Sequence, residues 1–284
     1  MRKGIILAGG SGTRLQPLTL ATSKQLLPVY DKPMIYYSLS ILMLAGINDI
    51  LIICNKDDLM AFKKLFHDSK RLGLNLSYEI QESPNGIAEA LIIGEKFLDG
   101  NPCCLVLGDN FLFGQDIKNK LIEANSDHKK ARIFGHYVAD PTSYGVAIIK
   151  ESRVVEILEK PKKLVSNYAI PGIYFLPRDA PRVTLELIPS ERNELEITDL
   201  LQLYLQQNKL EISLLGRGTA WIDMGTHDKL LSAANYVSSV QKIQSFQVAN
   251  IHEISLRQNW ISREELLEMI QKKKTNYFTY LMDL

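Results

Sequence analysis

The chain has 284 residues, 46% of them hydrophobic and 23% charged, and its formal net charge is +1. This composition is typical of a globular protein with a large buried core. A net charge so close to zero excludes a global basic field that would attract nucleic acid, so phosphate binding must depend on local cations.

The first half of the chain alternates strand and helix. Apolar runs predict strands near 5–7, 50–54, 76–80 and 103–107, and helices near 34–45, 58–66, 87–97 and 117–123. This order predicts an α/β fold with a mostly parallel sheet and helices on both faces. Ligands of such sheets bind at the carboxyl ends of the strands.

From about residue 131 the pattern becomes rich in strands, which we expect near 131–138, 146–150, 154–158, 169–175 and 211–215. Helices are expected near 179–187, 197–206, 228–240 and 263–272. No repeat or linker interrupts the chain. We therefore predict one domain over 1–284, made of a first part (about 1–130), a strand-rich part (about 131–227) and a helical C-terminal appendage (about 228–284).

Cysteine usage and hydropathy indicate a cytoplasmic protein. The three cysteines lie in apolar runs, and their odd number without metal-ligand spacing predicts reduced core thiols. The apolar stretch 34–53 is broken at 46–49, which favours a buried helix, a turn and a strand over a membrane span. The apolar run at 4–8 is too short for a targeting signal.

A glycine-rich turn follows the first predicted strand. Three glycines, Gly9, Gly10 and Gly12, let backbone N–H groups approach an anion without obstruction by Cβ atoms. Arg14 adds a forked donor suited to phosphate, and Lys24 adds a compact positive charge. Such a turn with two nearby cations predicts a polyphosphate site.

Two better-known phosphate loops do not fit this turn. The chain has no Walker sequence, and the dinucleotide fingerprint needs a third glycine where Leu15 stands. The missing glycine disfavours an NAD-dependent dehydrogenase.

Two aspartates end apolar segments that lie far apart in the sequence. Asp109 follows the apolar run 105–108, and Asp223 follows Trp221 and Ile222. A buried carboxylate needs a partner, and two carboxylates at a phosphate crevice are ligands of the kind Mg²⁺ prefers. The alternative is that each aspartate caps a following helix.

These segments resemble the sugar-1-phosphate nucleotidylyltransferases. The family signature Gly-Gly-x-Gly-Thr-Arg-Leu followed by Lys-x-x-x-Pro matches residues 9–15 and 24–28, and the stretch 23–37 is similar to glucose-1-phosphate thymidylyltransferases. The resemblance covers essentially the whole chain. It implies a Rossmann-like mixed sheet, a homotetramer, Mg²⁺ as cofactor, and transfer of a thymidylyl group from dTTP to glucose 1-phosphate. In this view the first part binds nucleotide, the second binds sugar, and the appendage serves oligomerisation and regulation.

The resemblance also implies roles for the residues that match the family motifs. Those implied to bind nucleotide are Leu7, Gly9, Gly10, Ser11, Gly12, Thr13, Arg14, Lys24, Gln25, Gln81, Pro84, Gly86 and Asp109. Those implied to contact the sugar are Asn110, Tyr144, Gly145, Glu159, Lys160, Ile170 and Trp221. The implied catalytic residues are Arg14, Lys24, Asp109, Lys160 and Asp223, with Asp109 and Asp223 as the metal ligands.

Several of these positions also have simpler interpretations. Glu159 and Lys160 are either a surface ion pair at a turn or a sugar-phosphate clamp. Gln81 offers a donor and an acceptor that match the edge of thymine or uracil, but it cannot distinguish the two bases, and its segment is also compatible with a solvated loop. Two positions depart from the family: Pro171 replaces a small hydroxyl residue, and Asn193 replaces a glycine. Transfer from UTP, transfer to an amino-sugar phosphate, and a non-catalytic nucleotide-sugar sensor remain alternatives.

A second nucleotide-sugar site is implied away from the crevice. Glu253 and Arg257, four residues apart, pair on a surface helix in the simplest interpretation. The resemblance instead places them in a regulatory site together with Gly114 and the turn formed by Arg217 and Gly218. The effector that it implies is dTDP-L-rhamnose.

Overall fold

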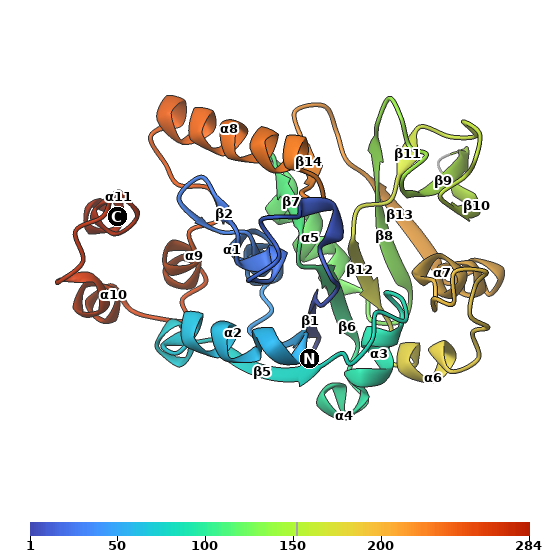
Figure 1. Ribbon diagram of the computed structural model, residues 1–284, viewed down its shortest axis with the longest axis horizontal. Coiled ribbons are helices and arrows are strands. Elements are labelled where there is room, and N and C mark those ends of the chain that lie inside the picture. The colour runs from blue at the N-terminus through green and yellow to red at the C-terminus, as the bar shows by residue number, and fades with distance from the viewer. Residues whose placement is uncertain (152) are drawn as a thin grey trace.

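A sheet of ten strands lies at the centre of the part of the chain that the structure describes, residues 1–151 and 153–284. In the computed structural model the strand order is β10-β9-β11-β8-β12-β6-β1-β4-β5, and β13 pairs with β8 (Figure 1). The first half of the sheet is parallel and consists of β1 (Lys3–Ala8), β4 (Asp49–Cys54), β5 (Asn75–Ile80) and β6 (Cys103–Leu107).

The second half of the sheet is mostly antiparallel. Its strands are β8 (Ala131–Tyr137), β9 (Gly145–Lys150), β10 (Arg153–Glu159), β11 (Tyr168–Ala169), β12 (Ile173–Leu176) and β13 (Leu210–Leu214). Strand β12 joins the two halves, because it pairs antiparallel with both β6 and β8. Only β13 runs parallel to its neighbour β8 among these described strands.

Side chains of the parallel strands alternate between two cores. Along β1, Ile6 and Ala8 join one buried cluster and Ile5 joins the other, and β4 and β6 divide in the same way. The first cluster includes residues of α1 (Ile35–Leu44), α5 (Ile117–Ser126), α9 (Ile251–Arg257) and α10 (Arg263–Ile270). The second includes residues of α3 (Glu89–Ile93), α6 (Ala180–Thr184) and α7 (Ile197–Gln206). Helices therefore cover both faces, as predicted.

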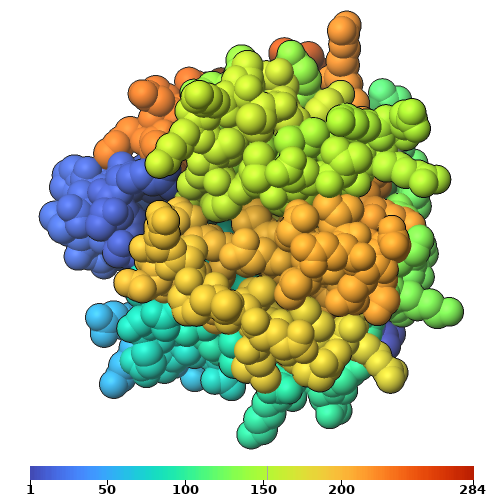
Figure 2. Space-filling model, turned by 90° about the vertical axis from the view of Figure 1, so that its right-hand side faces the viewer, coloured from blue at the N-terminus to red at the C-terminus, as the bar shows by residue number. Residues whose placement is uncertain are grey.

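The remaining elements lie around this centre. They are β2 (Pro28–Val29), β3 (Lys32–Pro33), α2 (Leu59–Leu65), α4 (Glu95–Leu98), β7 (Asn110–Phe113), β14 (Ala220–Asp223), α8 (His227–Gln244) and α11 (Asn276–Thr279), with five short 3₁₀ turns among the residues described. Figure 1 shows α9, α10 and α11 at one end of the molecule, α8 along the top, and α6 and α7 at the other end. Figure 2 looks onto the latter end, where residues of the middle of the chain form the surface.

The fold class is confirmed, with local differences from the predicted elements. The helix predicted over 87–97 is divided into α3 and α4 at Gly94, where a Cβ would lie 2.8 Å from the Ile5 side chain. The strand predicted over 169–175 is divided into β11 and β12, because Pro171 cannot donate a ladder hydrogen bond. Strands β7 and β14, which pair antiparallel, were missed.

The structure shows the state of the three cysteines and the length and apolar character of the helices. All three cysteines are buried free thiols, as predicted, and burial raises the pKa of Cys103 to about 12. Among the described residues, no helix combines the length and the apolar character needed to cross a bilayer.

Candidate active site

The glycine turn directly follows β1 and adopts conformations that favour glycine. Gly10 has φ 94° and Gly12 has φ 57°, both in the region that L side chains rarely adopt. Gly9 lies against another residue of the predicted site, since a Cβ there would be 2.4 Å from Gln81 Oε1. The Gly12 carbonyl accepts a hydrogen bond from the Thr19 hydroxyl at 2.8 Å. The turn is thus held by local contacts, and it leads into the 3₁₀ turn that carries Arg14.

The β7–β14 pair brings the two aspartates together. Asp109 immediately precedes β7, and Asp223, the last residue of β14, is opposite Asn110. The Met224 N–H donates to the Asp109 carbonyl at 3.0 Å. The helix-cap alternative is wrong for both aspartates, because Asp109 precedes a strand and the cap of α8 is Thr226.

Each of these carboxylates is paired with a lysine. Lys24 Nζ lies 2.5 Å from Asp109 Oδ2, and Lys229 Nζ lies 3.3 Å from Asp223 Oδ2. Burial acts to raise the pKa of Asp109, but the Lys24 charge and hydrogen bonds to the carboxylate outweigh it, so this pKa lies below its ordinary value. Burial raises the pKa of Asp223, and the negative charge of Asp109 raises it further against the two lysines. The site therefore holds two interacting carboxylates in different environments.

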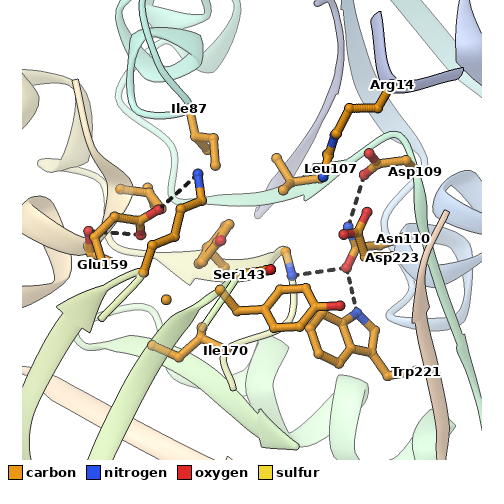
Figure 3. A pocket seen from close by; sticks show the side chains of 17 residues that line it. Arg14, Ile87, Leu107, Asp109, Asn110, Ser143, Glu159, Ile170, Trp221 and Asp223 are labelled. Atoms are coloured by element: carbon orange, nitrogen blue, oxygen red, sulfur yellow. Dashed lines mark hydrogen bonds and ion pairs between the residues drawn. The ribbon is translucent and has the colours of Figure 1, made fainter. Parts of the chain in front are cut away.

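A cavity of about 190 Å³ opens beside these carboxylates (Figure 3). It is lined by ten of the residues that the sequence assigned to the site: Arg14, Asp109, Asn110, Tyr144, Gly145, Glu159, Lys160, Ile170, Trp221 and Asp223. Figure 3 shows Arg14, Asp109 and Asp223 toward one side of the cavity and Glu159 toward the other. One cavity is therefore lined by residues from the parallel half of the sheet, from the strand-rich part and from β14.

Aromatic rings form one wall of this cavity. The Tyr144 ring packs on Trp221, with centroids 4.9 Å apart. The Trp221 indole N–H donates to Asn110 Oδ1 at 2.7 Å, and the Gly172 N–H donates to the same oxygen at 3.0 Å. Asn110 in turn donates from Nδ2 to Asp109 Oδ1 at 3.1 Å. The wall is thus connected by hydrogen bonds to one of the two carboxylates.

Glu159 and Lys160 lie where β10 ends. Lys160 has φ 40°, its N–H donates to the Tyr144 carbonyl at 3.0 Å, and its Nζ lies 3.4 Å from Glu159 Oε1. Glu159 also faces Arg192, at 3.2 Å, and accepts a hydrogen bond from the Thr198 hydroxyl at 3.3 Å. The ion pair of the simpler interpretation is present, and both of its members also line the cavity.

The predicted base-binding residues lie outside the lining of this cavity, and one of them, Gln81, contacts the glycine turn at Gly9. Gln81 is buried and donates from Nε2 to Glu89 Oε2 at 2.7 Å. Gly86 has φ 112°, and a Cβ there would lie 2.4 Å from the Leu195 carbonyl oxygen, so this position requires glycine for structural reasons. Gln25 is buried and accepts a hydrogen bond from the Ser23 hydroxyl at 2.6 Å.

The residues of the implied regulatory site fall into two groups. Glu253 and Arg257 line a separate cavity of about 220 Å³, where Arg257 Nε donates to Glu253 Oε1 at 2.7 Å. Gly114 instead lies against the turn at Gly218, whose carbonyl oxygen would be 3.4 Å from a Cβ at Gly114. Neither that turn nor Arg217 lines the cavity.

Sequence reasoning missed Lys229. It lies six residues after Asp223, in the first turn of α8. A lysine is unfavourable there, because the positive end of the helix dipole favours acidic side chains. That unfavourable placement, so soon after a candidate metal ligand, was the signal available in the sequence.

Comparisons with known proteins agree with this geometry. A protein-family profile described as Nucleotidyl transferase matches residues 3–240. A glucose-1-phosphate thymidylyltransferase from Neisseria meningitidis is 48% identical over 284 residues, covering 99% of each chain.

Two solved structures are also similar. A candidate glucose-1-phosphate thymidylyltransferase from Bacillus anthracis, solved in complex with a sucrose, has a TM-score of 0.77 and 37% identity, covering 83% of this chain and 95% of its own. A UDP-glucose pyrophosphorylase complexed with UDP-glucose has a TM-score of 0.72 and 25% identity, covering 84% of this chain and 99% of its own. With a family match over most of its length and a full-length relative at this identity, the chain belongs to the nucleotidyl transferase family and, within it, to the glucose-1-phosphate thymidylyltransferases.

Proposed function

We propose that this chain transfers a thymidylyl group from dTTP to glucose 1-phosphate, giving dTDP-glucose and pyrophosphate. The observation that carries the proposal is the pair of aspartates, Asp109 and Asp223, each with its own lysine, at one side of a cavity that reaches Glu159 and Lys160. The 48% identity to a thymidylyltransferase supports dTTP as the nucleotide. The 25% sequence identity to a UDP-glucose pyrophosphorylase keeps UTP as the alternative nucleotide.

The donor set of the site fits Mg²⁺. Among the described residues no group of three histidine, cysteine, aspartate or glutamate side chains gathers as a metal site, so the chain itself offers two carboxylates. Mg²⁺ is commonly bound by one or two carboxylates, with waters and substrate phosphates completing its shell. We propose Asp109 and Asp223 as its ligands; when bound, the ion would neutralise phosphate charge.

The reaction requires one oxygen–phosphorus bond to form and one to break. A phosphate oxygen of glucose 1-phosphate attacks the α-phosphorus of dTTP in line, and pyrophosphate leaves with the electrons of the broken bond. Both the nucleophile and the leaving group are already ionised phosphates, so no covalent enzyme intermediate is needed. The residues contribute by positioning and by neutralising charge.

Each group of site residues has a distinct task in this proposal. Arg14, Lys24 and the amides of the glycine turn hold the triphosphate and stabilise the leaving pyrophosphate. Lys160 holds the sugar phosphate, and Glu159 accepts hydrogen bonds from sugar hydroxyls. The wall of Tyr144 and Trp221 packs against the sugar. Gln81, with Pro84 and Gly86, borders the base.

Regulation and assembly remain proposals as well. We propose that the cavity at Glu253 and Arg257 binds dTDP-L-rhamnose, which would inhibit by favouring a less active conformation. Gly114, Arg217 and Gly218 are part of this proposal only if ligand binding brings them to that cavity, since they do not line it. A homotetramer stays a prediction.

The direct test is identification of the product. Purified chain with dTTP, glucose 1-phosphate and Mg²⁺ should form dTDP-glucose, identified by mass, together with an equal amount of pyrophosphate. Chelation of the metal should stop product formation, and added Mg²⁺ should restore it. Failure to form dTDP-glucose under these conditions would refute the proposal.

A further inference from the structure

Lys229 reaches from α8 to two residues that line the cavity, Tyr144 and Asp223. Its Nζ donates to the Tyr144 hydroxyl at 2.6 Å and to Asp223 Oδ2 at 3.3 Å. The ammonium also lies 4.8 Å from the centre of the Tyr144 ring. Lys229 does not itself line the cavity, whereas both of its partners do. Lys229 therefore contacts two lining residues without being part of the lining itself.

These two contacts complete a chain of interactions between the carboxylates. Tyr144 packs on Trp221, Trp221 donates to Asn110, and Asn110 donates to Asp109. Lys229 adds the link from Tyr144 to Asp223. Without its ammonium, nothing in this chain of contacts would connect the phenol with the second carboxylate.

The contact also determines which carboxylate oxygen of Asp223 is bound by Lys229 and which one faces Arg14 and Gly225. Lys229 binds Oδ2, while Oδ1 and the Arg14 guanidinium both face Gly225, whose Cβ, if present, would lie 3.0 Å from Oδ1 and 2.8 Å from Arg14 Nη2. Gly225 therefore leaves room for Arg14 and the carboxylate to approach each other. Any side chain at position 225 would crowd both groups.

We propose that Lys229 is a positioning residue, which ties the Tyr144 phenol to the Asp223 carboxylate so that the sugar-binding wall and the second carboxylate are held as one unit. The proposal rests on the proposed function, because it assigns the wall to the sugar 1-phosphate. It predicts that loss of the ammonium affects the sugar phosphate more than the nucleotide, which is held at the glycine turn.

The test uses Lys229→Met, which keeps most of the aliphatic stem, and Tyr144→Phe, which removes only the hydroxyl. Each should raise the KM for glucose 1-phosphate by about 10-fold, as expected for loss of a charge-assisted hydrogen bond, and leave the KM for dTTP nearly unchanged. The double variant should be no worse than Lys229→Met alone, because both changes break the same link. Lys242→Met is the matched control, since it is an exposed lysine about 20 Å further along α8.

A second readout does not depend on turnover. The chain has two tryptophans, so in a Trp260→Phe background the fluorescence reports Trp221 alone. Lys229→Met should release the Tyr144 ring and make Trp221 more accessible to acrylamide, and Lys242→Met should not. If the wild type formed no dTDP-glucose, the proposed function would fail, and the quenching measurement would still decide the role of Lys229.

Three results would overturn the role of Lys229. The first is an equal change in the KM values for glucose 1-phosphate and dTTP. The second is a double variant in which the effects of the two single variants multiply. The third is acrylamide quenching of Trp221 that is the same in Lys229→Met as in the wild type. Should Lys229→Met fail to fold, Tyr144→Phe alone decides, because it breaks the same hydrogen bond from the other side.

Discussion

At the scale of single residues, the two carboxylates should matter most for the rate. We expect Asp109→Asn and Asp223→Asn each to lower kcat by at least about 100-fold, comparable to loss of one preorganised transition-state contact. Each change keeps the shape of the side chain and an oxygen that can still accept a hydrogen bond from the paired lysine, so the fold should persist. The measurement is kcat at saturating Mg²⁺, with thermal unfolding as the check on folding. Asp228→Asn, at an exposed position, is the control; near wild-type turnover in either test variant would contradict the metal-ligand assignment.

Lys160 should distinguish the two substrates. If its ammonium holds the sugar phosphate, Lys160→Met should raise the KM for glucose 1-phosphate about 10- to 150-fold, and the KM for dTTP much less, because one charge-assisted contact is lost. Initial rates at varied concentrations of each substrate measure this. Lys162→Met, an exposed lysine two residues further on, should change neither value. Equal increases in both KM values would indicate a general defect and remove the specific role.

Residue-scale geometry also explains one departure from the family pattern. Asn193 has φ 58°, and its N–H donates to the Ser190 carbonyl at 2.8 Å. Asparagine is enriched at such backbone conformations among non-glycine residues, so it can replace the usual glycine at modest cost. Pro171 is buried between β11 and β12, and its neighbour Gly172 provides the N–H that binds Asn110. The hydroxyl missing at Pro171 is therefore not needed for that link.

At the scale of elements, α9 carries the implied regulatory contact. We expect Arg257→Ala to raise the concentration of dTDP-L-rhamnose needed for half-inhibition by about 10-fold or more, since an ionic contact with a diphosphate would be lost. Dose–response curves for wild type and variant measure the effect. Arg178→Ala, an exposed arginine after β12, is the control. Identical curves for wild type and Arg257→Ala would leave Glu253 and Arg257 as a surface ion pair only.

The same helix carries a buried histidine with a consequence for stability. His252 lies against Tyr277, with Nδ1 3.1 Å from the phenol oxygen. Burial, together with the positive charge of Lys273, lowers the pKa of His252 to about 4, and Asp68 partly opposes this shift. Because the folded pKa lies below the unfolded value of about 6.5, the unfolded chain binds the proton more readily as pH falls from about 6.5 toward 4. Stability is therefore lost on the acid side.

This group alone should lower the free energy of unfolding by about 2 kcal/mol between pH 7.5 and 5. Urea unfolding at the two pH values measures the change. In His252→Gln the pH dependence should be smaller by that amount, because glutamine does not titrate. A pH dependence identical in wild type and variant would contradict the assignment.

A comparison of the predicted and the observed elements shows which parts of the fold the sequence reveals. The parallel strands β1, β4, β5 and β6 and the helices α1, α2 and α5 were predicted because long apolar runs and their period identify them locally. The β7–β14 pair was missed because its partners are about a hundred residues apart and each is only four residues long. That pair is what places Asp223 beside Asp109. Motifs therefore selected residues that line one cavity, but the contact that brings the two aspartates together depends on non-local pairing that periodicity does not reveal.

At the scale of the whole molecule, the continuous sheet brings the two groups of candidate site residues together. The parallel half carries the glycine turn and Asp109, and the antiparallel half carries Glu159 and Lys160. Strand β12 joins the halves by pairing with both β6 and β8. The crevice at the carboxyl ends of the parallel strands therefore continues into the strand-rich part, as expected for a sheet of this class.

The central claim is that this crevice joins a thymidine nucleotide to glucose 1-phosphate. Its most direct test is pyrophosphate release from every combination of dTTP or UTP with glucose 1-phosphate or an amino-sugar 1-phosphate. We predict the highest kcat/KM for dTTP with glucose 1-phosphate. A higher value for UTP or for the amino sugar would contradict the assigned substrates, and intact nucleotide-sugar binding without any pyrophosphate release would identify a sensor in place of an enzyme.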